Sequence, residues 1–419
     1  MDKLKIRIYN LLRWSERYTK TDMVYLVSGG SWLTGSQILI ALASFLATII
    51  LGLYLPKDVY GNYKYVLSVF AILSAFTLTG LHTAIIQSVA SKHGGVLQQA
   101  FRLGLKWSVF AVLGAIIGAS YYFYKDNAFL GYSLILIAFA IPLSHSFGLF
   151  GSYLVGSKEF KKFGITCFIE NVFPLACVII SIFFTKNILL VLVCYFIASI
   201  SIKGILFFYT IHTSAKSGIS DQGLAKYSIK LSALNIISTI AAHIDKVLIF
   251  TSFGAVELAI YSFASAFPDR IRSLLKNLTA LMVPKFSENK TENRTIVFSN
   301  KVVNLSVLLI LTTVAYIICA PFLYALFFPN YMESVFFSRL LALTILSSIA
   351  VIPLSFFIAE KREDYFAKAT LGGSLFQLVV LVPLTYYMGI VGVVISRILG
   401  SYAIAGISYY LLYKEIKQK

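Results

Sequence analysis

Residues 30–55, GSWLTGSQILIALASFLATIILGLYL, contain no acidic or basic side chain. A helix needs about 20 apolar residues to cross the hydrocarbon core of a bilayer, so this run is long enough. Its small and polar residues recur at intervals of three and four, which places them on one helix face. The stretch therefore predicts a membrane-spanning helix with a polar stripe, formed by Thr34, Gln37, Ala41, Ser44 and Thr48.

The whole chain has the same apolar character. Its 419 residues are 58% hydrophobic and only 13% charged, with a mean hydropathy of +0.81. A soluble fold of this length needs more polar surface, and backbone groups in lipid must be satisfied within helices. The sequence predicts an all-α integral membrane protein with about twelve transmembrane helices. The predicted spans are 30–55, 64–90, 103–124, 129–155, 164–184, 187–211, 228–254, 259–284, 301–326, 334–359, 367–388 and 389–413.

The basic residues predict the orientation of these spans. Of the 36 Lys and Arg residues, 25 lie in the terminal segments and in every second connector. Only four lie in the opposite connectors: Lys57, Lys64, Lys125 and Lys186. Cytoplasmic loops carry the excess of positive charge, so both termini are expected in the cytoplasm. The net charge of +18 then reflects topology, and we expect no nucleic-acid partner. The connectors on the other side are short, which argues against an external catalytic domain.

The polar stripe recurs 198 residues later in the span 228–254, as Ser232, Asn235, Thr239, Ala242 and Lys246. Six spans per half is an even number, so both halves would enter the membrane in the same direction. This predicts two pseudo-symmetric six-helix bundles around a central cavity. Alternatively, such small polar residues serve only close helix packing. The predicted parts are a cytoplasmic interfacial segment 1–29, an N-terminal bundle 30–211, a cytoplasmic linker 212–227, a C-terminal bundle 228–413 and a cytoplasmic tail 414–419.

Apart from the basic residues counted with the connectors, seven fall inside predicted spans, and few acids accompany them. A cation in hydrocarbon costs from about 3 to well over 10 kcal/mol, so it is expected to face a wet cavity or an anionic guest. Lys276 and Arg339 lie near the ends of their spans and could instead extend to the membrane surface. Pro268 frees a backbone carbonyl and is expected to kink its helix. The candidate substrate-binding residues are Lys246, Arg270, Arg272, Lys203, Arg397, Lys276 and Arg339.

Three embedded acids are candidates for ion coupling: Glu170, Asp245 and Asp269. Glu170 has no basic neighbour in the sequence and is the better proton-binding candidate, whereas Asp245 and Asp269 could each be internal counter-ions. His82 and His145 could titrate near neutral pH, or be ordinary hydrogen-bonded helix contacts. The four cysteines show no ligand spacing. We expect no disulfide, metal site, cofactor or catalytic residue.

Several passages of the chain contain loose patterns of Gly, Tyr and Pro. They are residues 37–63, ending Leu55-Pro56-Lys57-Asp58-Val59-Tyr60-Gly61-Asn62-Tyr63; Gly80-Leu81-His82-Thr83-Ala84-Ile85-Ile86-Gln87; Asp245-Lys246, Gly254 and Leu258-Ala259-Ile260-Tyr261-Ser262-Phe263-Ala264; and Pro268 on to Pro284-Lys285-Phe286. These passages resemble the polysaccharide flippases of the Wzx type, in the superfamily that includes the multidrug and toxic-compound exporters. The likeness spans most of the chain.

The resemblance implies a non-enzymatic flippase of the bacterial inner membrane. Its substrate would be an undecaprenyl-pyrophosphate-linked oligosaccharide, moved to the periplasmic leaflet by alternating access for O-antigen or capsule assembly. The implied partners are this lipid-linked glycan and membrane lipids, with a polysaccharide polymerase and a chain-length regulator as further candidates. The embedded cations suit a pyrophosphate, because Lys and Arg engage phosphate oxygens through charge-assisted hydrogen bonds.

Three alternatives remain open from the sequence. A cation-coupled multidrug exporter of the same fold would favour embedded acids over embedded cations. A membrane enzyme, such as a polymerase or a lipid-using glycosyltransferase, would commonly carry a large external loop or acids at the membrane edge. A scaffold without transport activity would leave the embedded cations unexplained.

Overall fold

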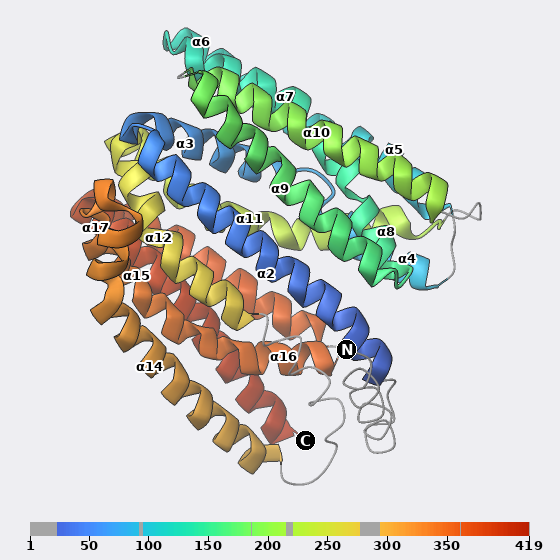
Figure 1. The fold of residues 1–419 in the computed structure, drawn as a ribbon. Coiled ribbons are helices and arrows are strands. Elements are labelled where there is room, and N and C mark those ends of the chain that lie inside the picture. The colour runs from blue at the N-terminus through green and yellow to red at the C-terminus, as the bar shows by residue number, and fades with distance from the viewer. Residues whose placement is uncertain are drawn as a thin grey trace, which may run out of the picture. The chain divides into compact units, whose positions relative to one another are not determined.

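The structure is a computed structural model, and it describes residues 23–91, 95–185, 187–214, 221–276, 294–360 and 362–418. Within these ranges every regular element is a helix, as Figure 1 shows. The all-α prediction is confirmed. Most of the predicted interfacial segment 1–29, part of the predicted linker 212–227 and the end of the predicted span 259–284 lie outside the described residues.

The chain divides into two compact units. The first comprises Met1–Thr48 and Leu73–Ser232, and the second comprises Ile49–Ile72 and Ala233–Lys419. Three helices contribute residues to both units: α2 (Met23–Tyr54), α3 (Lys57–Ser74) and α11 (Leu224–Phe253). This grouping differs from the predicted division because Ile49–Ile72 belong with the second unit. The division into two six-helix bundles stays a prediction.

In the first unit, a central helix pair is surrounded by the others. α7 packs against α5, α6 and α10, and α8 packs against α4, α9 and α10. The span formed by α7 and α8 has 56% of its most apolar window buried, compared with 17–28% for α9, α10 and the α5–α6 span. The helices are α4 (Leu81–Ala90), α5 (Val96–Trp107), α6 (Val109–Tyr124), α7 (Ala128–Gly148), α8 (Phe150–Gly156), α9 (Phe160–Phe184) and α10 (Ile188–Thr213).

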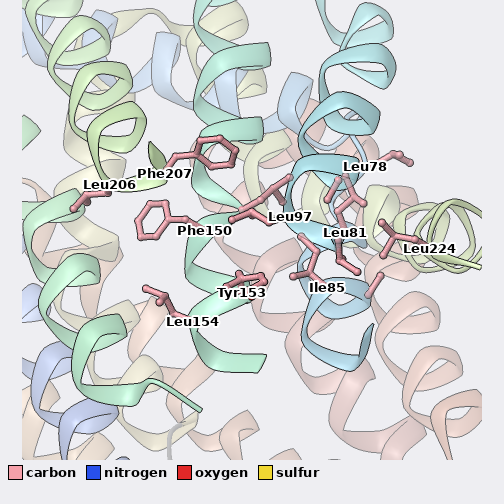
Figure 2. Packing of buried hydrophobic residues seen from close by; sticks show 14 residues of the cluster. Leu78, Leu81, Ile85, Leu97, Phe150, Tyr153, Leu154, Leu206, Phe207 and Leu224 are labelled. Atoms are coloured by element: carbon pink, nitrogen blue, oxygen red, sulfur yellow. The ribbon is translucent and has the colours of Figure 1, made fainter. Parts of the chain in front are cut away.

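A buried apolar cluster joins α4, α5, α8 and α10 in this unit (Figure 2). Leu81 and Phe150 are fully buried there, and Phe207 of α10 packs in the same cluster. Because lipid tails are as apolar as these side chains, the cluster stabilises the unit through close van der Waals packing. Other members are Leu78, Ile85, Leu97, Tyr153, Leu154, Leu206 and Leu224.

The second unit has its own central helix, α15. It packs against α12, α14 and α17, and its span has 67% of its most apolar window buried. The α7–α8 span is the fourth predicted span of the first half of the chain, and the α15 span is the fourth of the second half. The most buried span therefore has the same position in the order of spans in both halves. The elements are α12 (Ala255–Lys276), α14 (Arg294–Phe327), η1 (Pro329–Tyr331), α15 (Ser334–Leu346), η2 (Ser347–Ala350), α16 (Val351–Ala359) and α17 (Glu363–Gln418).

The spans found in the described residues account for ten of the twelve predicted ones. Nine helices are long and apolar enough to cross a membrane, and the last of these, Glu363–Glu415, has 53 residues. Gly389 divides it with a φ of 58° and a ψ of −136°. Glycine reaches positive φ without steric cost, so the chain breaks where the sequence placed the start of the last span. The predicted spans 64–90 and 259–284 are missing from the nine because α3 and α4 are separate helices and α12 carries many charges.

A hydrogen bond stabilises the turn between α3 and α4. The backbone N–H of Gly80 donates to Ser232 Oγ at 2.9 Å. A side chain at this glycine would collide with α11, because a Cβ would lie 2.4 Å from the carbonyl oxygen of Ser228. Ser232 of the polar stripe is therefore a packing residue, as the alternative interpretation of the stripe expected for such positions.

Aromatic stacking explains why α3 belongs to the second unit up to Ile72. The ring of Tyr60 stacks on Phe263 at 4.5 Å, and Tyr65 stacks on Phe250 at 3.9 Å between centroids. Such pairs add about 0.5–1.5 kcal/mol beyond the area they bury. At the N-terminal end of α3, Lys57 Nζ pairs with Glu333 Oε2 at 2.9 Å.

The break in the α12 hydrogen-bond ladder at Pro268 is compensated by Tyr324 of α14. The ring nitrogen of Pro268 cannot bond the carbonyl four residues back, which belongs to Ala264. Tyr324 Oη donates to the carbonyl of Phe263 at 2.7 Å and approaches that of Ala264 at 3.4 Å. The tyrosine is fully buried. It therefore supplies a donor at the point where the proline removes one.

Replacing Tyr324 with phenylalanine is expected to lower the melting temperature of the purified protein. The change leaves buried carbonyls with no side-chain donor, which costs about 1–3 kcal/mol. Tyr410→Phe is the matched control, because this tyrosine is exposed. Equal melting temperatures for the two variants would contradict the proposed role of the hydroxyl group.

Candidate functional site

Arg397 of α17 lies between two acids in the second unit. Its Nη2 donates to Asp269 Oδ1 at 2.6 Å, and its Nη1 lies 3.7 Å from Asp245 Oδ2. Nη1 also donates to the hydroxyl of Tyr261 at 3.2 Å. That hydroxyl donates in turn to Asp245 Oδ2 at 2.5 Å. The guanidinium group is therefore held in place by residues from α11 and α12.

The two acids differ in exposure. The side chain of Asp245 is 2% exposed, whereas that of Asp269 is 41% exposed. Both act as counter-ions to Arg397 in this structure, which was one of the two interpretations left open by the sequence. Their role in ion coupling stays a prediction.

Three other predicted cations lie near this network without an acid of their own. Lys246 of α11 and Arg270 and Arg272 of α12 are half-buried. Within the part of the chain that the structure describes, no carboxylate lies within 4.0 Å of their side-chain nitrogens. Their charges still interact with the network, since Arg272 and Lys246 both act on Asp269 electrostatically.

Lys64 of α3 joins the same group. It is half-buried, and it lies close enough to Lys246 and Arg270 for their positive charges to repel. We call these residues the cationic cluster: Lys64, Lys246, Arg270, Arg272 and Arg397, with the acids Asp245 and Asp269. Five cations and two acids leave the cluster with three positive charges in excess. An anionic ligand would relieve the repulsion among them.

The first unit contains a separate polar group. Lys203 Nζ of α10 lies 3.9 Å from Glu170 Oε1 of α9, with both side chains about one-fifth exposed. Glu170 has no basic neighbour in the sequence, but the contacting helices α9 and α10 place it beside Lys203, which is 33 positions away. His82 and His145 also meet here, with ring centroids 5.8 Å apart, and His82 Nδ1 lies 2.8 Å from Ser152 Oγ.

Of the two predicted cations near span ends, Arg339 is not part of the cluster. Arg339 of α15 is exposed, and its Nε donates to the carbonyl of Ile317 at 3.1 Å. Lys276 is the last described residue of α12, and its side chain lies outside the described part.

Sequence reasoning missed two members of this site. Lys64 was counted as a connector residue because the predicted span began there, whereas α3 begins at Lys57. Tyr261 belongs to the passages that carry the family resemblance, and nothing in its spacing indicates the bond to Asp245. The spacing of Tyr60 and Lys64, one helical turn apart, was the available signal for Lys64.

Comparison with known proteins supports the family and the fold. A family model described as polysaccharide biosynthesis protein matches residues 26–290. No curated protein matches the sequence.

Three solved structures illustrate the fold similarity. The lipid II flippase MurJ in an inward closed conformation matches with a TM-score of 0.69 and 12% identity, covering 91% of this chain and 87% of that one. An inward-facing multidrug resistance MATE family transporter of the MOP superfamily matches with a TM-score of 0.68 and 13% identity, covering 90% and 95%. A MOP superfamily transporter from Pyrococcus furiosus, whose reversed binding-pocket polarity suggests a different function, matches with a TM-score of 0.57 and 12% identity, covering 94% and 95%.

At such low identity these structures establish the fold and nothing finer. The family model, in contrast, covers more than half of the chain. The protein belongs to the polysaccharide biosynthesis protein family, and it has the multi-pass, all-helical fold of MOP-superfamily membrane transporters.

Proposed function

We propose that the protein is a flippase for undecaprenyl-pyrophosphate-linked oligosaccharide. It would move repeat units from the cytoplasmic to the periplasmic leaflet of a bacterial inner membrane by alternating access, with both termini in the cytoplasm. Membership of a polysaccharide biosynthesis family and the fold shared with a lipid II flippase support this proposal. The observation that carries it is the excess positive charge of the cationic cluster.

The cluster suits a pyrophosphate in both charge and donor geometry. A guanidinium group presents planar, paired donors that match phosphate oxygens, and an ammonium group adds a compact charge. Arg270, Arg272 and Lys246 are the proposed head-group ligands because they lack a carboxylate within 4.0 Å among the described residues. Lys64 adds charge from α3. The prenyl tail would remain in lipid while the head group crosses.

The charge of the cluster argues against a multidrug exporter as the function of this chain. Exporters of cationic drugs need acids or aromatic surfaces at their binding sites, whereas both acids here are engaged by Arg397. The transporter from Pyrococcus furiosus is described by a reversed pocket polarity. Binding-site charge can therefore differ on this fold, and the charge seen here favours an anionic substrate.

Replacing Arg270 and Arg272 with alanine is expected to reduce delivery of lipid-linked glycan to the outer leaflet by about tenfold or more. Each substitution removes hydrogen bonds to the charged head group, and such bonds are worth about 1.5–3 kcal/mol. The measurement is labelling of lipid-linked glycan in the periplasmic leaflet, at matched expression of each variant.

Arg339→Ala is the matched control for this experiment. It removes an arginine of the same unit that is exposed and bonded to a backbone carbonyl. We expect normal delivery from this variant. Normal delivery from the double variant Arg270→Ala/Arg272→Ala would reject the cationic cluster as the head-group site.

A further inference from the structure

The two counter-ions of Arg397 are not equivalent. Asp245 is buried, accepts from Tyr261 at 2.5 Å and lies on the Nη1 side of the guanidinium group. Asp269 is 41% exposed and receives a single bond from Nη2 at 2.6 Å. Arg397 therefore has one fixed counter-ion and one that is open to exchange.

The free-energy cost of separating an acid from Arg397 is higher for Asp245 than for Asp269. Without Arg397, Asp245 would be a buried charge with only neutral donors, which is strongly unfavourable. Asp269 would be hydrated as it left, because its carboxylate is already partly exposed. The Nη2 side is therefore where another anion can replace a carboxylate at low cost.

The surroundings of Asp269 favour such a replacement by a phosphate group. Lys246 and Arg272 act on this carboxylate electrostatically, and Arg270 follows it in α12. These are the residues proposed above to bind the substrate head group. A pyrophosphate brings more negative charge and more acceptor oxygens than one carboxylate, so it can satisfy Arg397 and its neighbours together.

We propose that Asp269 is an internal substitute for the anionic head group, and that the arriving pyrophosphate displaces it from Arg397. This inference rests on the proposed function, and it adds a competing ligand to that site. When the site is empty, Asp269 keeps Arg397 oriented and lowers the repulsion among the cations. When the head group leaves, Asp269 returns to Nη2, and this return favours release.

The test is binding of inorganic pyrophosphate to the purified full-length protein in detergent, measured by isothermal titration calorimetry. Asp269→Asn removes the competing charge and is expected to bind about fivefold more tightly than the wild type, since a partly exposed ion pair is worth up to about this factor. Asp269→Glu keeps the charge and is expected to bind like the wild type. Equal or weaker binding by Asp269→Asn would overturn the proposal.

Glu333→Gln is the charge-matched control. It removes an acid of the same unit that pairs with Lys57 and has a 63% exposed side chain. Its pyrophosphate affinity is expected to match the wild type. An equal gain from Glu333→Gln and Asp269→Asn would show a general charge effect and would also overturn the proposal.

A second measurement needs no variant that might misfold. Infrared difference spectra of wild-type protein with carbon-13-labelled aspartate are expected to show a carboxylate band moving toward its frequency in water when pyrophosphate is added. An unchanged aspartate band at saturating pyrophosphate would overturn the exchange.

The outcomes separate this inference from the proposed function. If Arg270→Ala/Arg272→Ala weakens pyrophosphate binding while Asp269→Asn leaves it unchanged, the exchange is wrong and the head-group site stands. If the wild type binds no pyrophosphate, both are wrong.

Discussion

Replacing Arg397 with alanine is expected to destabilise the second unit more than any other single change in the cationic cluster. The variant leaves Asp245 as a buried charge, since its side chain is only 2% exposed. Removing one partner of a buried ion pair costs about 3–5 kcal/mol. We expect the melting temperature of the purified protein in detergent to fall by on the order of 10 °C.

Two comparisons isolate the cause of this loss. Arg339→Ala removes an exposed arginine of the same unit and is expected to change stability by no more than about 0.5 kcal/mol. Adding Asp245→Asn to Arg397→Ala is expected to recover part of the loss, because the unpaired buried charge is then absent. If the Arg397→Ala and Arg339→Ala variants have the same melting temperature, the buried network contributes little to the stability of the fold.

Replacing Gly61 with alanine is expected to disrupt the packing of α3 within the second unit. A Cβ at this position would lie 1.8 Å from the carbonyl oxygen of Ala255 and 2.5 Å from its carbonyl carbon. Both are backbone atoms and cannot rotate away. Overpacking costs about 1–3 kcal/mol where side chains can adjust, so we expect the upper end of that range or more. The drop in melting temperature measures it.

Gly406→Ala provides the control for Gly61→Ala. It lies in α17, and an added Cβ there would meet nothing within 4 Å. Alanine has the better helix propensity by about 1 kcal/mol, so the variant is expected to be as stable as the wild type or slightly more so. A Gly61→Ala protein as stable as Gly406→Ala would contradict the close helix contact.

Hydropathy was sufficient to predict most of the fold, because each span in lipid must satisfy its own backbone. It predicted the helical class and the break at Gly389. It could not predict that residues 49–72 belong with the second unit. That grouping depends on contacts such as Tyr60 on Phe263, between residues about 200 positions apart, which no local pattern encodes.

The candidate site was predictable in residue type and less so in pairing. Embedded charge is rare enough to indicate Lys246, Arg270 and Arg397 directly. The sequence could not show that Arg397 is neutralised by Asp245 and Asp269, since ion pairs between helices depend on rotation and packing. The same limit applies to Lys203 and Glu170, which only the packing of α9 and α10 brings together.

Pro268 divides α12 into two parts with different contacts. The part before it is fixed by buried contacts: Tyr261 donates to Asp245, Phe263 stacks on Tyr60, and Tyr324 donates to the carbonyl of Phe263. The part after it contains Asp269, Arg270 and Arg272, which belong to the proposed head-group site. Under the proposed function, mutations in the second part could therefore adapt the head-group site to a new substrate while the first part keeps the helix packed.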